Sequence, residues 1–304
     1  MNDTMSDVPH RCGFVTIVGA PNAGKSTLLN RLVGAKVSIV THKVQTTRSQ
    51  IRGIAVFSDT QIVFVDTPGI FAPKKRLERA MVDAAWSGVS DADVLVVLVD
   101  GQRGVDANVR RIVDGIAASG RKAILAINKI DAVKRPELLA LAQELNVGDI
   151  FTDTFMISAL DGDGVDDLRA ALVTRMPVGP WLYPEDQLSD LPQRLLASEI
   201  TREKAYLRLH QELPYALAVD TESWEDFRDG SVRIQQTIYV ERDSQKGIVL
   251  GKGGQTIKAM RAEAQADLAE MLERPVHLFI HVKVRENWVN DPGRYREWGL
   301  NFDA

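Results

Sequence analysis

A single loop constrains this chain most: Gly19-Ala-Pro-Asn-Ala-Gly-Lys25-Ser26, which follows an apolar run at residues 14–18 and precedes a helical pattern. The spacing fits G-x-x-x-x-G-K-[ST], whose glycines let backbone N–H groups turn inward around phosphate oxygens. The following helix adds the positive end of its dipole. Lys25 suits the outer phosphates, and the Ser26 hydroxyl suits Mg²⁺. We therefore expect a nucleotide site formed by Gly19, Ala20, Pro21, Asn22, Ala23, Gly24, Lys25, Ser26 and Thr27.

Apolar, β-branched runs alternate with amphipathic stretches from residue 14 to about residue 176. This rhythm predicts an α/β domain at residues 1–176, with a parallel sheet covered on both faces by helices. One pair departs from it, because residues 50–57 and 61–66 flank a short turn and predict an antiparallel hairpin. The sheet is therefore expected to be mixed but mostly parallel. The expected parallel strands are residues 14–18, 62–65, 94–99, 123–127 and 149–157.

A stretch rich in proline separates this region from the remainder. Residues 176–184 hold three prolines and a glycine, which favours a linker, placed at residues 177–192. Residues 193–304 then predict an α+β domain, with Pro214 stopping its first helix. Its expected elements, in order, are a helix at residues 193–210, strands at residues 215–220 and 232–241, a short apolar helix at residues 248–250, the glycine turn at residues 251–254, a helix from residue 255 to about 273, and a strand at residues 275–284.

Composition limits where the chain works and what it binds. The 304 residues carry a net charge of −4, so any grip on nucleic acid needs a local basic patch. The single cysteine, Cys12, excludes an internal disulfide and fits a reducing compartment. Residues 1–10 lack the apolar run of a signal peptide, and the apolar run at residues 94–99 is too short to span a bilayer. A cytoplasmic protein is expected.

Two further motifs indicate which base is bound. Asn128-Lys129-Ile130-Asp131 follows its own strand, at the edge where an open α/β sheet binds ligand. A carboxylate at Asp131 can accept from guanine N1–H and the N2 amino group, a pairing that adenine cannot offer. Ser158 and Ala159 follow the next strand, where their backbone N–H groups would face guanine O6. GTP is therefore expected rather than ATP.

The segment Asp66-Thr67-Pro68-Gly69-Ile70 ends another strand. Asp66 suits Mg²⁺, and the Gly69 N–H suits a γ-phosphate, although a plain Pro-Gly turn is the alternative. Thr47 offers a hydroxyl for Mg²⁺, with a solvated threonine pair as the alternative. We expect Ser26, Thr47 and Asp66 to hold the metal. The expected catalytic residues are Lys25, Thr47, Asp66 and Gly69.

In the second domain, Gly251-Lys-Gly-Gly254 forms a G-x-x-G turn between two helices. Such turns clamp the backbone of single-stranded RNA in KH domains, because glycines let phosphates approach closely. Residues 244–262 hold four basic residues and no acid, yet residues 181–304 carry a net charge of −5. A glycine helix cap that meets protein is the alternative. The expected RNA-binding residues are Lys246, Ile248, Gly251, Lys252, Gly253, Gly254, Ile257, Lys258 and Arg261.

In this order the motifs of the first domain resemble the Ras-like P-loop GTPase superfamily. Ile70 stands where Ras-like enzymes carry a water-orienting glutamine, so slow intrinsic hydrolysis is expected. Asn22 occupies the position at which an asparagine helps several bacterial GTPases hold K⁺; an ordinary turn-forming asparagine is the alternative. The order around the glycine turn is that of the type II KH domain.

Longer segments resemble the Era GTPases across nearly the whole chain. These are Gln45-Thr-Thr-Arg48, Asp66-Thr-Pro-Gly69 with Ala72-Pro-Lys-Lys75, Asn128-Lys-Ile-Asp131, residues 244–254 and residues 282–288. The resemblance implies GTP/GDP and Mg²⁺ as ligands, and the 3′ end of 16S rRNA in the maturing small ribosomal subunit as the partner. It also implies that GTP favours the RNA-competent state, and that the protein associates peripherally with the inner membrane. A monomer is expected.

Other functions stay open from the residues alone. The chain could be an RNA-binding module with nucleotide as a structural cofactor. It could also be a membrane-linked or tRNA-linked regulatory GTPase whose second domain binds protein. A phosphotransferase fits less well, because Asn128-Lys-Ile-Asp131 selects guanine.

Overall fold

The computed structural model describes residues 9–146, 148–210 and 213–304. By contacts the chain forms two compact units. The first unit comprises Met1–Ser38, Thr47–Asp190 and Trp298–Ala304, and the second comprises Ile39–Thr46 and Leu191–Glu297. The predicted lack of a signal peptide at residues 1–10 lies outside the described residues except for positions 9 and 10.

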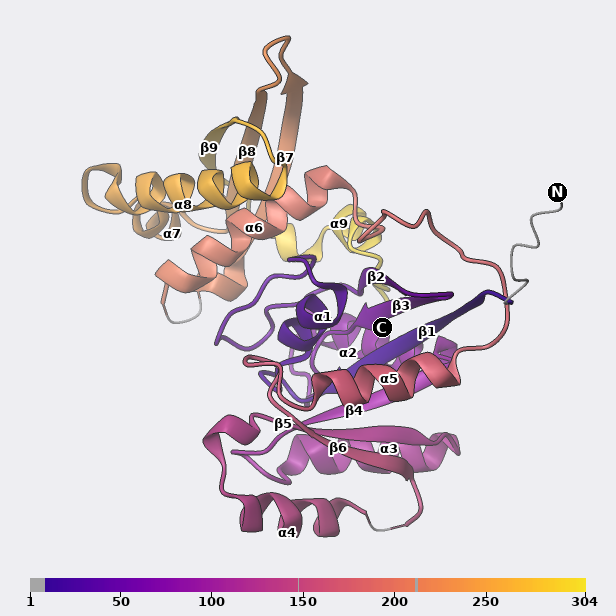
Figure 1. Cartoon of the computed structure of the whole chain (residues 1–304). Helices are drawn as coiled ribbons and strands as arrows, with labels where there is room; N and C mark the ends of the chain where they lie inside the picture. The colour runs from indigo at the N-terminus through magenta and orange to yellow at the C-terminus, as the bar shows by residue number, and fades with distance from the viewer. Residues whose placement is uncertain (1–8, 147, 211–212) are drawn as a thin grey trace, which may run out of the picture. The chain divides into compact units, whose positions relative to one another are not determined.

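A six-stranded sheet in the order β2-β3-β1-β4-β5-β6 forms the centre of the first unit (Figure 1). Its strands are β1 Arg11–Gly19, β2 Ile51–Phe57, β3 Thr60–Asp66, β4 Val94–Asp100, β5 Ala123–Asn128 and β6 Phe151–Ile157. Only β2 and β3 pair antiparallel, with Phe57 opposite Thr60. The predicted sheet, mostly parallel with one hairpin, is confirmed.

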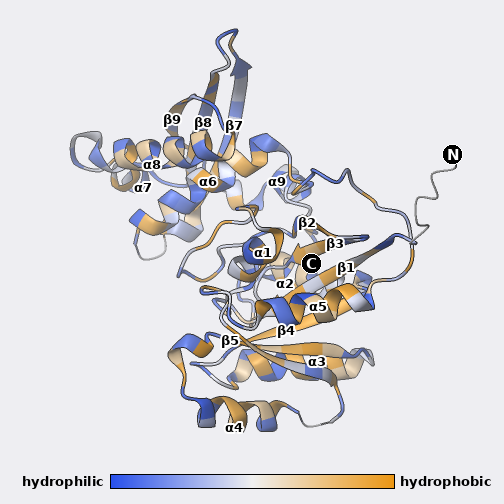
Figure 2. Ribbon diagram, in the orientation of Figure 1, coloured by the Kyte–Doolittle hydropathy of each residue, from blue (hydrophilic) through white to orange (hydrophobic). Residues whose placement is uncertain are grey.

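Helices cover both faces of this sheet. They are α1 Lys25–Val33, α2 Arg76–Asp91, α3 Ala107–Ser119, α4 Arg135–Leu145 and α5 Val165–Arg175, with a short 3₁₀ turn, η1, at Ile130–Ala132. Successive strand residues point to opposite faces, so Ile17 packs in the core with α1 and α5, and Val18 in the core with α2, α3 and α4. The central strands β4 and β5 are therefore apolar along most of their length (Figure 2).

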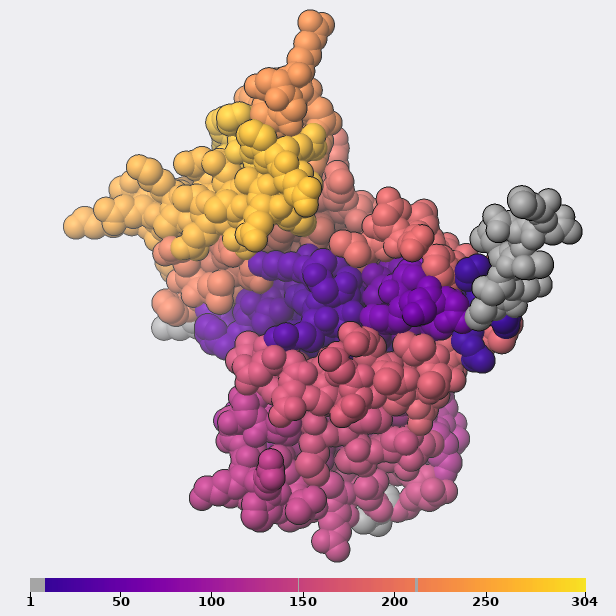
Figure 3. Space-filling view, in the orientation of Figure 1, coloured from indigo at the N-terminus to yellow at the C-terminus, as the bar shows by residue number. Residues whose placement is uncertain are grey.

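The second unit contains a three-stranded sheet in the order β7-β8-β9. β7 and β8 pair antiparallel, β8 and β9 pair parallel, and α6 and α8 pack on one face through Ile200, Ile234 and Leu268. The β7–β8 turn projects beyond the helices of this unit (Figure 3). The elements are α6 Gln193–Arg208, η2 Leu213–Ala216, β7 Leu217–Asp226, β8 Val232–Val240, α7 Asp243–Leu250, η3 Lys252–Gly254, α8 Gln255–Met271, β9 Val276–Val284, η4 Trp288–Asn290 and α9 Pro292–Glu297.

Several predicted boundaries of the second region shift. The helix expected at residues 193–210 ends at Arg208, because Leu209 turns to an extended backbone, and Pro214 lies in η2 beyond that end. The strand expected at residues 215–220 runs to Asp226 through an irregularity between Thr221 and Ser223. Except for Trp224, this extension consists of polar residues, so apolar alternation did not mark it.

The compact units also differ from the predicted division at residues 1–176, 177–192 and 193–304. Much of the linker belongs to the first unit, because the Ile54 N–H on edge strand β2 donates to the Leu188 carbonyl at 2.8 Å. The tail from Trp298 onward also belongs there, with the Arg76 guanidinium 4.4 Å from the Phe302 ring. As a division into GTP-binding and RNA-binding domains, the boundaries stay a prediction.

Candidate nucleotide site and glycine turn

The predicted phosphate loop lies between β1 and α1. Gly24 has a φ of +100°, and a Cβ there would lie 2.3 Å from Asn128 Nδ2, so the position requires glycine. The buried Lys25 Nζ donates to the carbonyls of Gly19 and Ala20 at 3.2 and 3.1 Å. Burial lowers the pKa of Lys25 to about 8, opposed by the charge of Asp66. A phosphate in the loop would favour the charged ammonium.

The three predicted metal ligands lie together. Ser26 Oγ donates to Asp66 Oδ2 at 2.6 Å, Thr47 Oγ1 lies 3.3 Å from the same oxygen, and the two hydroxyls are 3.0 Å apart. Burial raises the pKa of Asp66, opposed by Lys25 and by these hydrogen bonds. Asp66 Oδ1 is buried without a hydrogen-bond partner. Hard oxygen donors around an unsatisfied carboxylate oxygen fit Mg²⁺.

Ser38 joins this cluster, although nothing in the sequence marked it. Its Oγ donates to Asp66 Oδ2 at 3.0 Å. Asn30 on α1 holds the backbone in place, because its Oδ1 accepts from the N–H groups of Val37 and Ser38, both at 2.9 Å. Its Nδ2 also donates to the Ser38 carbonyl at 2.7 Å. The residues that orient Asp66 therefore extend beyond the recognised motifs.

The segment after β3 lies against the loop. A Cβ on Gly69 would lie 2.9 Å from Pro21 Cγ, so only glycine fits this close approach. Thr67 Oγ1 donates to the Ile17 carbonyl at 2.9 Å, which gives it a structural contact. Ile70 is buried in the core with its N–H on the Gly19 carbonyl at 3.1 Å. An apolar side chain in the core cannot orient water, and slow hydrolysis stays a prediction.

Asn128, at the start of one segment expected to bind the base, links the phosphate loop to the other such segment, Ser158 and Ala159. Its Nδ2 donates to the Ala23 carbonyl, and its Oδ1 accepts from the Ala159 N–H, both at 2.8 Å. That N–H is thus already used, and the Ser158 N–H donates to the Asp163 carbonyl at 2.9 Å, so both N–H groups expected to face guanine O6 have other partners in this structure. Lys129 Nζ lies 2.6 Å from Asp100 Oδ2.

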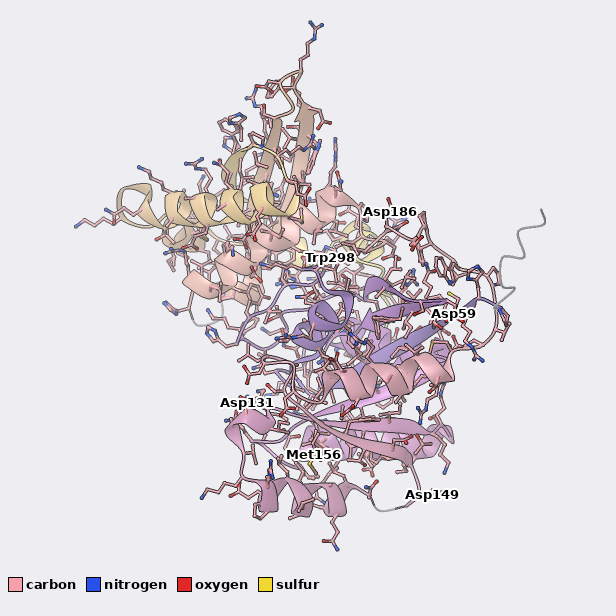
Figure 4. The ribbon with its side chains drawn as sticks, viewed as in Figure 1. Asp59, Asp131, Asp149, Met156, Asp186 and Trp298 are labelled. Carbon is pink, nitrogen blue, oxygen red and sulfur yellow. The ribbon has the colours of Figure 1, made fainter. Side chains whose placement is uncertain are left out.

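The carboxylate expected to select guanine is exposed. Asp131 lies in η1, directly after β5 (Figure 4). Among the described residues it has no hydrogen-bond partner, so both its oxygens can accept from a base. Pro68 and Ile130 complete the predicted set; Pro68 is buried and Ile130 half-buried.

The glycine turn connects α7 and α8 at the end of that helix pair (Figure 1). A Cβ on Gly251 would lie 2.1 Å from Thr256 Oγ1, whereas Gly253 and Gly254 have φ of +61° and +75° with open space around them. Lys252 is exposed beside them. The turn thus presents backbone and positive charge to solvent, as a phosphate clamp requires.

The residues expected to flank the turn divide into two groups. Lys258 is exposed and Ile248 is 57% exposed, whereas Lys246 and Ile257 are half-buried. Arg261 is occupied, because its Nη1 donates to Gln265 Oε1 at 3.2 Å and lies 3.5 Å from the Leu278 carbonyl. Arg261 therefore fits the RNA-binding set less well than the lysines do.

Fold and site together define a class: a P-loop GTPase unit combined with a KH domain. Residues 14–129 match the family described as 50S ribosome-binding GTPase, and residues 212–289 match the KH domain family. The chain is 59% identical to GTPase Era of Rhizobium meliloti over 99% of this chain and 98% of that protein. It is 62% identical to GTPase Era of Afipia carboxidovorans over 97% and 96%. The chain belongs to the Era GTPase family and is a GTPase.

Solved structures of similar proteins agree with this family assignment. The chain is similar to Era in complex with MgGDPNP and nucleotides 1506–1542 of 16S ribosomal RNA, at 38% identity and a TM-score of 0.90 over 95% of this chain and 99% of that one. An Aquifex aeolicus Era variant bound to GDP·AlF4⁻ matches with the same identity, coverage and TM-score. The predicted family, fold class and enzyme class are confirmed. The roles of individual residues stay predictions.

Proposed function

We propose that this protein is a GTP-driven switch that binds 16S rRNA near its 3′ end and assists assembly of the small ribosomal subunit. One observation carries the switch: the hydroxyl of Thr47, from the long α1–β2 loop, lies within hydrogen-bond distance of Ser26 and Asp66. A loop that reaches the site of the outer phosphate can respond to whether that phosphate is present. The relative solved with MgGDPNP and 16S rRNA nucleotides supports the partner.

Ser26, Thr47 and Asp66 would hold Mg²⁺, which when bound neutralises phosphate charge. The chain's own groups do the rest. Lys25 exchanges two loop carbonyls for phosphate oxygens, and the Gly69 N–H donates to the γ-phosphate. Only GTP offers that outer phosphate, so it holds the Thr47 and Gly69 segments together, whereas GDP does not.

Asn22 is proposed as a contact to K⁺, a second positive charge near the phosphates. Its backbone has a φ of +65°, which also suits an ordinary turn-forming asparagine. Phosphate release measured in K⁺ and in Na⁺ buffers separates the two roles, because only K⁺ binding makes hydrolysis depend on the cation.

Cellular placement rests on the family resemblance and the sequence. We propose a cytoplasmic monomer that associates peripherally with the inner membrane. Among the described residues, no helix has the length and apolar character to cross a membrane. Flotation with anionic vesicles tests the membrane association, and sedimentation tests the monomer.

The deciding experiment measures binding of a labelled RNA from the 3′ end of 16S rRNA at fixed salt, with a GTP analogue, with GDP and without nucleotide. The switch predicts tightest binding with the GTP analogue and weak competition by scrambled RNA. Equal binding in all three states would favour an RNA-binding module with nucleotide as a structural cofactor. No binding would favour a regulatory GTPase whose second unit binds protein.

A further inference from the structure

The loop between α1 and β2 leaves and rejoins the first unit at one carboxylate oxygen. Ser38 Oγ and Thr47 Oγ1 lie 3.0 and 3.3 Å from Asp66 Oδ2. The residues between them, Ile39–Thr46, belong by contacts to the second unit. Whatever holds Ile39–Thr46 therefore acts on the two hydroxyls at its ends, because one peptide bond joins each end to its hydroxyl-bearing neighbour.

Helix α6 binds the backbone near both ends of this segment. Near the start, the Val40 N–H donates to Glu203 Oε1 at 2.9 Å. At the end, Arg202 Nη2 donates to the Thr46 carbonyl at 2.6 Å. Both contacts are to main-chain atoms, so they set the position of the segment whatever side chains it carries.

The two α6 side chains are themselves held rigidly. Arg202 and Glu203 are 2% and 3% exposed. Arg202 Nε donates to Glu199 Oε1 at 2.8 Å, and Lys204 Nζ lies 3.2 Å from Glu203 and 2.5 Å from Asp267. Exchanging buried ion pairs for apolar residues is often neutral or stabilising, so stability alone does not account for such a cluster.

We propose that Arg202 and Glu203 are positioning residues for the Mg²⁺ site. By fixing the ends of Ile39–Thr46, they determine how the Ser38 and Thr47 hydroxyls meet Asp66, and hence the affinity for Mg²⁺ and the retention of nucleotide. The inference rests on the proposed function, because it takes Ser26, Thr47 and Asp66 to be the metal ligands. Their effect reaches the metal ligands through the continuous chain from Ser38 to Thr47.

The test measures release of a fluorescent GDP from the full chain over a range of Mg²⁺ concentrations and in EDTA. Arg202→Met keeps the volume and removes the donor to Thr46. We expect it to raise the Mg²⁺ concentration for half-maximal retention about fivefold, at the lower end of the range for coupled sites. Release in EDTA stays as in the unaltered chain, because the effect acts through the metal ligands.

Two variants control the result. Arg208→Met makes the same change on the same helix, where the exposed Arg208 pairs with Glu263, and its midpoint stays unchanged. Arg202→Lys keeps the charge and one donor, and shifts the midpoint by about twofold. If Arg202→Met does not fold, the Arg202→Lys midpoint decides alone.

An unchanged midpoint in the Arg202 variants overturns the inference. So does release that accelerates equally in Mg²⁺ and in EDTA, which would mean general damage. Retention that is independent of Mg²⁺ already in the unaltered chain would instead overturn the metal part of the proposed function, and this inference with it.

Discussion

The Asp66 cluster and the glycine turn are built on opposite principles. Around Asp66, three hydroxyls converge on one oxygen of a buried carboxylate, and its other oxygen has no partner. At Gly251–Gly254, Lys252 and Gly253 are exposed, and Gly253 and Gly254 have open space around them. A buried polar network depends on every member, because any loss leaves an unsatisfied group. An exposed basic turn acts through summed charge, which each residue alters by a small amount.

The largest effect is expected at the buried carboxylate. Asp66→Asn keeps the shape but removes the charge, so GTP hydrolysis should fall by about 100-fold, the scale of one lost electrostatic contact in a preorganised site. Phosphate release at saturating GTP measures it. Asp83→Asn, on the exposed side of α2, is the matched control and should hydrolyse at the normal rate. A rate within threefold of the unaltered chain would show that Asp66 is no metal ligand.

The next largest effect is expected from a variant that disrupts the exposed glycine turn and leaves the buried Asp66 cluster intact. Lys252→Asp with Gly253→Asp places negative charge against RNA phosphate, so affinity for the 16S 3′ fragment should fall by about 50-fold. GTP hydrolysis without RNA should not change. The matched control is Arg228→Asp with Gly230→Asp in the β7–β8 turn, where Gly230 also has a positive φ, of +84°, and open space. Equal losses in both double variants would refute a specific clamp.

Ser38→Ala probes how far the buried network extends. It removes one of the hydrogen bonds to Asp66 Oδ2. The Mg²⁺ concentration needed to retain GDP should rise about tenfold, the low end for residues that orient a metal ligand. Fluorescent GDP release measures this, with Ser87→Ala on the exposed surface of α2 as the control. An unchanged midpoint would confine the site to the residues of the recognised motifs.

The smallest effect is expected from a single exposed lysine. Lys258→Ala should weaken RNA binding about threefold and lower the slope of log affinity against log salt by about one, because one phosphate contact is lost. Binding isotherms at several salt concentrations give the slope. Lys134→Ala, exposed in the first unit, should leave the slope unchanged. A Lys258→Ala loss that does not vary with salt would mean that this residue acts by packing.

Prediction from sequence succeeded for residues that lie in recognisable motifs. The phosphate loop is one continuous stretch, and Ser26, Thr47 and Asp66 do meet, because the carboxyl ends of β1 and β3 lie at the same sheet edge. Prediction from sequence was less complete for which side chains are exposed and which are buried. Ile248 is exposed as an RNA contact would need, whereas Val249 beside it is wholly buried in the core. Adjacent positions on a helix face different directions, and only packing shows which one is buried.

The sequence by itself determined the class of this protein and located the phosphate loop, the Asn128–Asp131 motif and the glycine turn, because each depends on residues a few positions apart. Only the tertiary structure decided what surrounds them. Ser38 reaches Asp66, and Val40 reaches Glu203 across 163 positions. The C-terminal tail is divided between the units as well: Trp288 and Tyr295 are buried in the second unit, whereas Trp298 and Phe302 belong to the first. Contacts over such separations leave no local pattern, because they form only when distant segments pack together.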